Sequence, residues 1–197
     1  MPRAAGNVIA FNGRDGVFVD SGFTGPANST IISSNSIFDN GGLGIDLAPD
    51  GVTQNDPGDD DAGANDLQNF PILSSASPAT GGGTTIQGTL NSVPFDIFSI
   101  EFFVSPECDP FRFGEGKVLL GSIDDVETGA SPNVKFKVTL PPTVPLGQFI
   151  TATATARGFR IGGTSEFSAC IPVKPDGDGD GVSDDVENGA PNLGAGG

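Results

Sequence analysis

The chain of 197 residues contains no histidine, no tryptophan and no tyrosine, and only 9 of its residues are lysine or arginine. Without histidine there is no Ser-His or Cys-His nucleophile pair, no imidazole metal ligand and no imidazole proton shuttle. Aspartate and glutamate number 25, so the net charge is −16. Because the basic residues are few and scattered singly, the sequence excludes a nucleic-acid-binding footprint and disfavours anionic membranes and polyanionic substrates.

Long apolar runs are also absent. No segment approaches the roughly 20 residues that cross a bilayer as a helix, and the first residues lack the apolar core of a secretion signal. The two cysteines, in an Asp-rich and Lys-poor chain, favour an oxidising, extracytoplasmic compartment. We therefore expect a piece of a longer secreted polypeptide, cut at both ends.

Four zones differ in composition. Residues 1–48 alternate short apolar runs with Asn and Gly, and residues 49–67 form an acidic connector. Residues 68–173 carry strand-like segments between Pro/Gly turns, and residues 174–197 are acidic and rich in glycine. A hydrophobic content of 36%, rich in Val, Ile and Phe, still permits a packed core. We predict an all-β chain.

The first zone contains an internal repeat. The segment 7–13 (NVIAFNG) resembles 35–41 (NSIFDNG), and 16–19 (GVFV) resembles 44–47 (GIDL), both at an offset of 28 residues. Short strands punctuated by Asn-Gly at such a period predict a β-solenoid, with alternate Ile and Val side chains pointing inward. Asparagine tolerates left-handed corners and can stack in side-chain ladders. We interpret four asparagines as corner residues without a further role: Asn7, Asn12, Asn35 and Asn40.

This run, from Gly6 to Leu47, resembles the last rungs of bacterial right-handed parallel β-helix surface proteins. In that family such rungs are often followed by an acidic connector, a sandwich domain and a C-terminal tail. The resemblance implies truncated right-handed parallel β-helix rungs in residues 1–48 and a bacterial cell-surface location. Because about two rungs cannot bury their own apolar faces, we also expect an unpaired N-terminal face.

The third zone predicts seven strands. Alternation is clearest at 134–140, where Val, Phe and Leu face one way and Lys and Thr the other, and it recurs at 98–104 and 150–155. Such patterns at this spacing predict an immunoglobulin-like antiparallel β-sandwich. The tryptophan of antibody domains is absent, so the resemblance to bacterial immunoglobulin-like modules is one of architecture. The predicted strands are 70–77, 84–90, 98–105, 117–123, 134–140, 149–156 and 167–173.

Cys108 follows the third predicted strand and Cys170 lies in the last one. We predict a structural disulfide between them, which would stabilise the fold by roughly 4 kcal/mol through loop entropy. The alternative is a redox-active or nucleophilic thiol. It lacks both a histidine and a Cys-x-x-Cys spacing.

The strongest local motif is DGDGDGVSDDVE at 176–187, which fits the calcium-loop pattern D-x-D-x-D-G-x5-E. Calcium prefers six to eight hard oxygen ligands. Gly181 permits the sharp reversal that turns the chain around the ion. The alternative, a solvated acidic linker, has no need of Gly at the sixth position or Glu at the twelfth. The predicted ligands are the carboxylates of Asp176, Asp178, Asp180, Asp184 and Glu187 and the backbone carbonyl of Val182.

The motif resembles the calcium loops of EF-hands, dockerins and thrombospondin type 3 repeats. Pro175 argues against an entering helix, and Gly189 and Pro191 limit any exiting helix. The resemblance therefore implies a structural, extracellular calcium loop in a flexible acidic tail.

The acidic connector offers a weaker candidate. Asp56, Asp59 and Asp61 could converge on a second ion, but their spacing does not fit a calcium-loop pattern that we can justify. We interpret the connector as a solvated spacer.

These features predict a non-catalytic, extracellular structural or adhesion module that binds calcium and contacts an unknown surface protein or glycan. The main alternative is the remnant of a β-helix polysaccharide lyase or glycoside hydrolase whose active site lies in upstream rungs. Sugar hydrolysis needs paired carboxylates. The rung residues Asp15, Asp20, Asp39 and Asp46 include members that look like corner or loop residues, and Arg14 is the only candidate base for a lyase.

A third class is a sandwich that binds a carbohydrate or a protein. Sugar platforms use exposed Trp and Tyr, which are absent. Four phenylalanines could form an apolar patch, although we expect them to cover the ends of the sandwich: Phe103, Phe111, Phe113 and Phe159.

Overall fold

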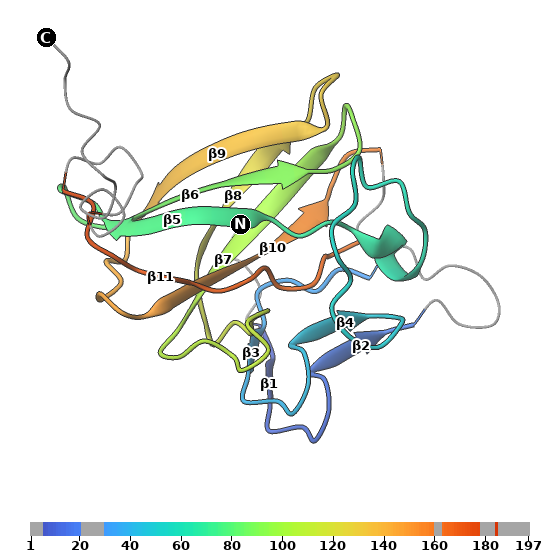
Figure 1. Ribbon diagram of the computed structural model, residues 1–197, viewed down its shortest axis with the longest axis horizontal. Coiled ribbons are helices and arrows are strands. Elements are labelled where there is room, and N and C mark those ends of the chain that lie inside the picture. The colour runs from blue at the N-terminus through green and yellow to red at the C-terminus, as the bar shows by residue number, and fades with distance from the viewer. Residues whose placement is uncertain (1–5, 21–29, 160–162, 178–183, 185–197) are drawn as a thin grey trace, which may run out of the picture.

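The computed structural model describes residues 6–20, 30–159, 163–177 and Asp184. The chain is all-β, as predicted, with one short 3-10 turn, η1 (Ala64–Leu67) (Figure 1). The strands are β1 (Val8–Ala10), β2 (Val17–Val19), β3 (Ser36–Phe38), β4 (Ile45–Leu47), β5 (Ile72–Pro78), β6 (Thr84–Asn91), β7 (Ile97–Ser105), β8 (Val118–Glu127), β9 (Asn133–Leu140), β10 (Phe149–Ala156) and β11 (Ile171–Pro172).

Strands β5 to β11 form two antiparallel sheets that share one core, and we call them the sandwich. One sheet has the order β5-β6-β9 and the other β11-β10-β7-β8. Their facing side chains include Ile86 and Leu90 from β6 and Phe98 from β7, all 0% exposed. Phe102 of β7 and Phe136 of β9 meet edge to face across the core, with ring centroids 5.8 Å apart. Burial of these apolar surfaces is the main term that holds the sheets together.

The predicted strands lie close to the observed ones, with one exception. The expected strand 167–173 is reduced to β11, because the segment before it pairs with β10 only partly through the backbone. The amides of Ser165 and Ser168 donate to the carbonyls of Ala154 and Ala152, both at 2.8 Å, but the return bonds go to serine side chains. The hydroxyls of Ser168 and Ser165 accept hydrogen bonds from the amides of Ala152 (3.0 Å) and Ala154 (2.9 Å). Serine hydroxyls compete in this way with regular ladder bonds.

Alternation in β9 follows the prediction, with Phe136 and Leu140 buried and Lys135 and Lys137 exposed. In β7 and β10 the residues expected to face solvent are buried as well. Glu101 is 3% exposed and Thr153 is 1% exposed. Another part of the chain therefore covers the outer face of this sheet.

That cover includes β1 to β4 with their turns, which we call the parallel unit. β1 pairs with β3 in parallel, Ile9 beside Ile37, and β2 pairs with β4, Phe18 beside Asp46. These partners are the residues that the sequence repeat aligns. Each of these sheets has two strands within the described residues.

The asparagines of the repeat form ladders between equivalent positions. The Asn12 amide and Nδ2 both donate to Asn40 Oδ1, at 3.1 and 2.8 Å. Asn7 donates to Asn35 Oδ1 in the same way, at 2.9 and 3.1 Å. The left-handed corner residues are instead Phe11 (φ 58°) and Asp39 (φ 55°). Phe11 and Asp39 thus make the backbone turn at these corners, and the asparagines that follow them, Asn12 and Asn40, stack their side chains.

The parallel unit docks on the four-stranded sheet. Ile37, Ile45 and Leu47 share a buried cluster with Phe103 of β7 and with Phe167. The rings of Phe103 and Phe167 meet edge to face at 5.3 Å. Figure 1 shows β1 to β4 gathered on one side of the sandwich. The fold therefore has a second apolar core between the parallel unit and the sandwich.

Candidate metal centres

The C-terminal loop is described at its beginning and at one later position. The Gly177 amide donates to Asp184 Oδ1 at 2.7 Å, and the Asp184 amide donates to the Pro175 carbonyl at 3.1 Å. These two bonds place Asp184 beside Pro175 and Gly177. Four of the predicted ligands lie outside the described residues: Asp178, Asp180, Val182 and Glu187. The complete ligand set of this loop stays a prediction.

The start of this loop is attached to the sandwich. The Lys174 amide donates to the Ala76 carbonyl at 3.0 Å, and Ser77 Oγ donates to Asp176 Oδ2 at 3.5 Å. Both partners belong to β5. The first predicted ligand, Asp176, is therefore held at a fixed place at the end of a strand.

The connector cluster, Asp56, Asp59 and Asp61, brings its carboxylates together. One carboxylate oxygen from each residue lies within 4.8 Å of the other two. Asp59 is 0% exposed, and its oxygens accept hydrogen bonds from the Asn69 amide (2.8 Å) and Ser92 Oγ (2.5 Å). The solvated-spacer interpretation was wrong, because this part of the connector is folded onto the sandwich.

Asparagine side chains fix the connector backbone. Asn69 Oδ1 accepts from the Asp56 amide at 3.0 Å, and Asn69 Nδ2 donates to the Asp56 carbonyl at 2.8 Å. Asn91 Oδ1 accepts from the Gly58 amide at 2.7 Å. Sequence reasoning missed Asn69 and Asn91. Their positions directly beside the predicted strands 70–77 and 84–90 were the only available signal.

Oxygen atoms in this cluster are suited to a hard cation. Asp56 Oδ2 accepts from the Asp60 amide at 3.1 Å, whereas Asp56 Oδ1 is buried without a hydrogen-bond partner. A carboxylate oxygen in that position is stabilised by a proton or by a metal ion. The donor set is all oxygen, which suits calcium or magnesium rather than zinc.

A second group, which we call the parallel-unit cluster, consists of Asp15, Asp46 and Asp50. Its carboxylate oxygens also lie within 4.8 Å of one another. Burial raises the pKa of Asp46; the Gly51 amide opposes this rise, and the negative charges of Asp15 and Asp50 add to it. Of the other two rung aspartates, Asp20 is exposed and Asp39 pairs with Lys117 at 3.6 Å.

Glu166 lies beside this second cluster, between the parallel unit and the sandwich. It is 2% exposed and accepts hydrogen bonds from the Leu47 and Thr53 amides, both at 3.0 Å. Burial raises its pKa to about 7, although these two hydrogen bonds oppose the rise, and the nearby charge of Asp46 adds to it. Its carboxylate joins two separate stretches of the chain.

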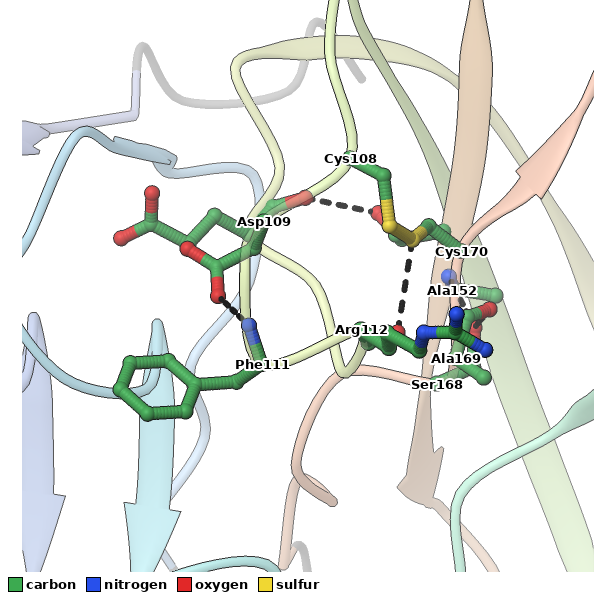
Figure 2. Close-up of a disulfide and its surroundings, with 10 residues drawn as sticks. Cys108, Asp109, Phe111, Arg112, Ala152, Ser168, Ala169 and Cys170 are labelled. Carbon is green, nitrogen blue, oxygen red and sulfur yellow. Dashed lines mark hydrogen bonds between the residues drawn. A yellow bond between two sulfur atoms is a disulfide. The ribbon is translucent and has the colours of Figure 1, made fainter.

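The predicted disulfide between Cys108 and Cys170 is confirmed (Figure 2). It ties the loop after β7 to the residue before β11, where the Cys170 amide also donates to the Arg112 carbonyl at 3.0 Å. Asp109 Oδ1 accepts from the Phe111 amide at 2.8 Å, and burial raises the pKa of Asp109 despite this bond. The loop after β7 is therefore held by the disulfide and by the Cys170–Arg112 backbone bond, and the Asp109 side chain bonds within it.

A cavity of about 550 Å³ lies beside the disulfide, with Asp109, Glu115 and Lys117 among its lining residues. Burial raises the pKa of Glu115, and hydrogen bonds from Asn40 oppose the rise. Glu115 Oε1 accepts from Asn40 Nδ2 at 2.7 Å and from the Asn40 amide at 3.1 Å. This glutamate thus holds the corner of the parallel unit in place.

The four phenylalanines considered as an alternative apolar patch do not share one environment. Phe103 is buried, and Phe113 meets Phe70 edge to face at 5.4 Å. Phe111 and Phe159 are exposed.

The sequence was compared with protein-family models and with curated protein sequences. No protein-family model matches the chain, and no curated protein sequence is significantly similar to it. Within the described residues there is no helix of the length and apolarity that crossing a membrane requires.

Proposed function

We propose that this chain is a non-catalytic structural or adhesion module of an extracellular or cell-surface protein, and that it binds calcium. The observation that carries the proposal is the connector cluster. Three aspartates from one short segment converge, and Asp56 presents a buried oxygen without a hydrogen-bond partner. Calcium there would neutralise the mutual repulsion of the carboxylates and lock the connector between the parallel unit and the sandwich.

The C-terminal loop supplies a second calcium position in this proposal. Its sequence fits the calcium-loop pattern, and its first residue is held by β5. An ion bound there would order the segment that leaves the sandwich. Calcium at the connector cluster and at the C-terminal loop would stiffen the chain where it enters and where it leaves the sandwich.

We further propose that the sandwich is immunoglobulin-like. Its strand order matches that of the seven-stranded constant type, except that β8 joins the sheet of β7 and not that of β9. The parallel unit fits the end of a β-helix, because its pairs share one register offset, its left-handed corners recur, and its asparagines form ladders. This architecture, together with the disulfide, supports a bacterial surface location.

Titration of the whole chain with calcium chloride in a calorimeter tests the proposal. We expect saturable binding in which Asp56→Asn weakens one site and Glu187→Ala weakens another. Asp125→Asn is the matched control, because it removes one negative charge from an exposed residue of β8. The absence of binding heat would refute the proposal. Binding that Asp56→Asn and Glu187→Ala both leave unchanged would refute it as well.

The alternative remains the remnant of a polysaccharide lyase or glycoside hydrolase. It is separated from our proposal by measuring the release of reducing sugar, or of unsaturated products, from a panel of acidic and neutral polysaccharides. We expect none. Turnover by this chain would show that it carries an active site of its own and would contradict the non-catalytic role.

A further inference from the structure

We propose that Asp15, Asp46 and Asp50 form a separate calcium site that ties the turn before β2 to β4 and to the turn after β4. The site extends the proposed calcium-binding role to another part of the chain. It does not require the connector cluster or the C-terminal loop to bind an ion.

Asp15 lies far from Asp46 and Asp50 in the sequence, and the parallel unit brings the three carboxylates together. Asp15 Oδ1 accepts from the Leu43 amide at 2.9 Å, which joins equivalent positions of the repeat. Asp46 Oδ2 accepts from the Gly51 amide at 3.1 Å, which closes the turn containing Asp50. Two of the three side chains are thus oriented by backbone amides before any ion arrives.

The observation that indicates a ligand is the state of Asp46 Oδ1. The Asp46 side chain is 0% exposed, and this oxygen has no hydrogen-bond partner. Asp46 lies in β4, whose other two residues, Ile45 and Leu47, belong to the second apolar core. A buried carboxylate among other carboxylates is stabilised by a cation or by a proton, and the parallel-unit cluster places further oxygen ligands around Asp46 for a cation.

Solvent can reach the site and complete the coordination sphere. Arg14, Asp15, Phe18 and Asp50 line a surface cavity of about 230 Å³. Calcium takes six to eight oxygens in adaptable geometry, so bidentate carboxylates and water can fill the sphere. Magnesium demands a stricter octahedron, which carboxylates already oriented by backbone amides supply less readily.

One positive charge already approaches the cluster. Arg14 Nη2 lies 3.6 Å from Asp50 Oδ2, and the two side chains are 79% and 73% exposed. Such exposed pairs contribute little to stability. Calcium would therefore displace the guanidinium from Asp50 at small cost, and Arg14 would leave the entrance open.

The test is an NMR titration of the whole ¹⁵N-labelled chain with calcium chloride alone. The amides of Leu43 and Gly51 report on this site, because they donate to Asp15 and Asp46, while the amide of Asn69 reports on the connector cluster. We expect saturable shifts of Leu43 and Gly51. In Asp50→Asn their midpoint should move to higher calcium by on the order of tenfold, because one charged ligand is lost.

Asp125→Asn serves as the control and should leave the midpoint unchanged. Since Asp50 is exposed, its replacement should not disturb folding. Shifts of Asn69 without shifts of Leu43 and Gly51 would overturn this site while leaving the connector proposal intact. Shifts of Leu43 and Gly51 with pH but not with calcium would also overturn it, because Asp46 would then hold a proton in place of an ion.

Discussion

Three buried glutamates of the sandwich hold the parallel unit in place: Glu101, Glu115 and Glu166. Glu101 accepts from the Ser34 amide at 2.8 Å, Glu115 from Asn40, and Glu166 from the Leu47 amide. Apolar burial is non-directional, whereas hydrogen bonds to these carboxylates fix the orientation of the parallel unit on the sandwich. Burial raises the pKa of Glu115 and of Glu166, which makes this interface sensitive to pH.

Glu166 gives the clearest pH prediction. Its pKa in the folded chain, about 7, lies above the ordinary value of 4.5, so the folded state binds the proton more tightly than the unfolded state. The contribution of Glu166 to the free energy of unfolding is therefore largest below pH 4.5, and it is lost as the pH rises toward 7. We expect about 3 kcal/mol of this loss to come from Glu166.

Urea unfolding of the wild type and Glu166→Gln across this pH range measures the effect. The variant should show a shallower fall in the free energy of unfolding, whatever its absolute stability. Glu127→Gln, at an exposed position, should keep the wild-type slope. Equal slopes in the wild type and Glu166→Gln would contradict the assignment.

Residue alternation could not reveal these buried carboxylates. Glu101 lies on the face of β7 that its sequence predicts to be exposed, beside Ser99. It is buried because the parallel unit, more than 60 residues away in the chain, covers that face. Local patterns report which residues can be inside, whereas a long-range contact decides which polar residues are covered.

At the scale of elements, the asparagine ladders organise the parallel unit. Asn40 is the central member, because its Oδ1 accepts from Asn12 and its Nδ2 donates to the Ile9 carbonyl at 3.2 Å and to Glu115. A single side chain thus links β1, the corner after β3 and the sandwich. Removing it leaves several partly buried polar groups without partners.

We therefore predict that Asn40→Ala lowers the free energy of unfolding by about 1 to 3 kcal/mol. Asn133→Ala is the matched control, because Asn133 is exposed and its side chain accepts one ladder bond, from Asn91 Nδ2 at 2.8 Å. Chemical denaturation followed by circular dichroism would compare them. A loss for Asn40→Ala no larger than that for Asn133→Ala would argue against the ladder as a stabilising element.

The strands of the sandwich were predictable because a half-buried strand alternates with a period of two residues. The pairing of β1 with β3 and of β2 with β4 follows the sequence repeat. The connector was not predictable. Its conformation depends on Asn69 and Asn91 rather than on apolar periodicity, and no local rule links an acidic segment to an asparagine that many residues separate from it.

At the scale of the whole molecule, the disulfide joins the long loop after β7 to the start of β11. The two cysteines are 62 residues apart, so the bond restricts a large part of the unfolded chain. We expect Cys108→Ser/Cys170→Ser to lower the free energy of unfolding by about 4 kcal/mol.

Thermal unfolding of the oxidised protein, the reduced protein and the double variant provides the measurement. The reduced protein and the double variant should unfold at similar temperatures, below the oxidised protein. Coincident transitions for all three would show that the bond contributes nothing to stability.

Acidic groups dominate the whole chain, with a net charge of −16, and they gather at the junctions between its parts. The connector cluster lies between the parallel unit and the sandwich, and the C-terminal loop follows the sandwich. If calcium binds at these places only in the folded state, binding adds directly to the free energy of unfolding.

The most direct test of this account is the midpoint of thermal unfolding in calcium and in a chelator, at equal ionic strength. At calcium concentrations about 100 times the dissociation constant, each site adds about 2.7 kcal/mol to stability. We predict a higher midpoint in calcium, which Asp56→Asn reduces and Asp125→Asn does not. The same midpoint in calcium and in chelator would contradict the account.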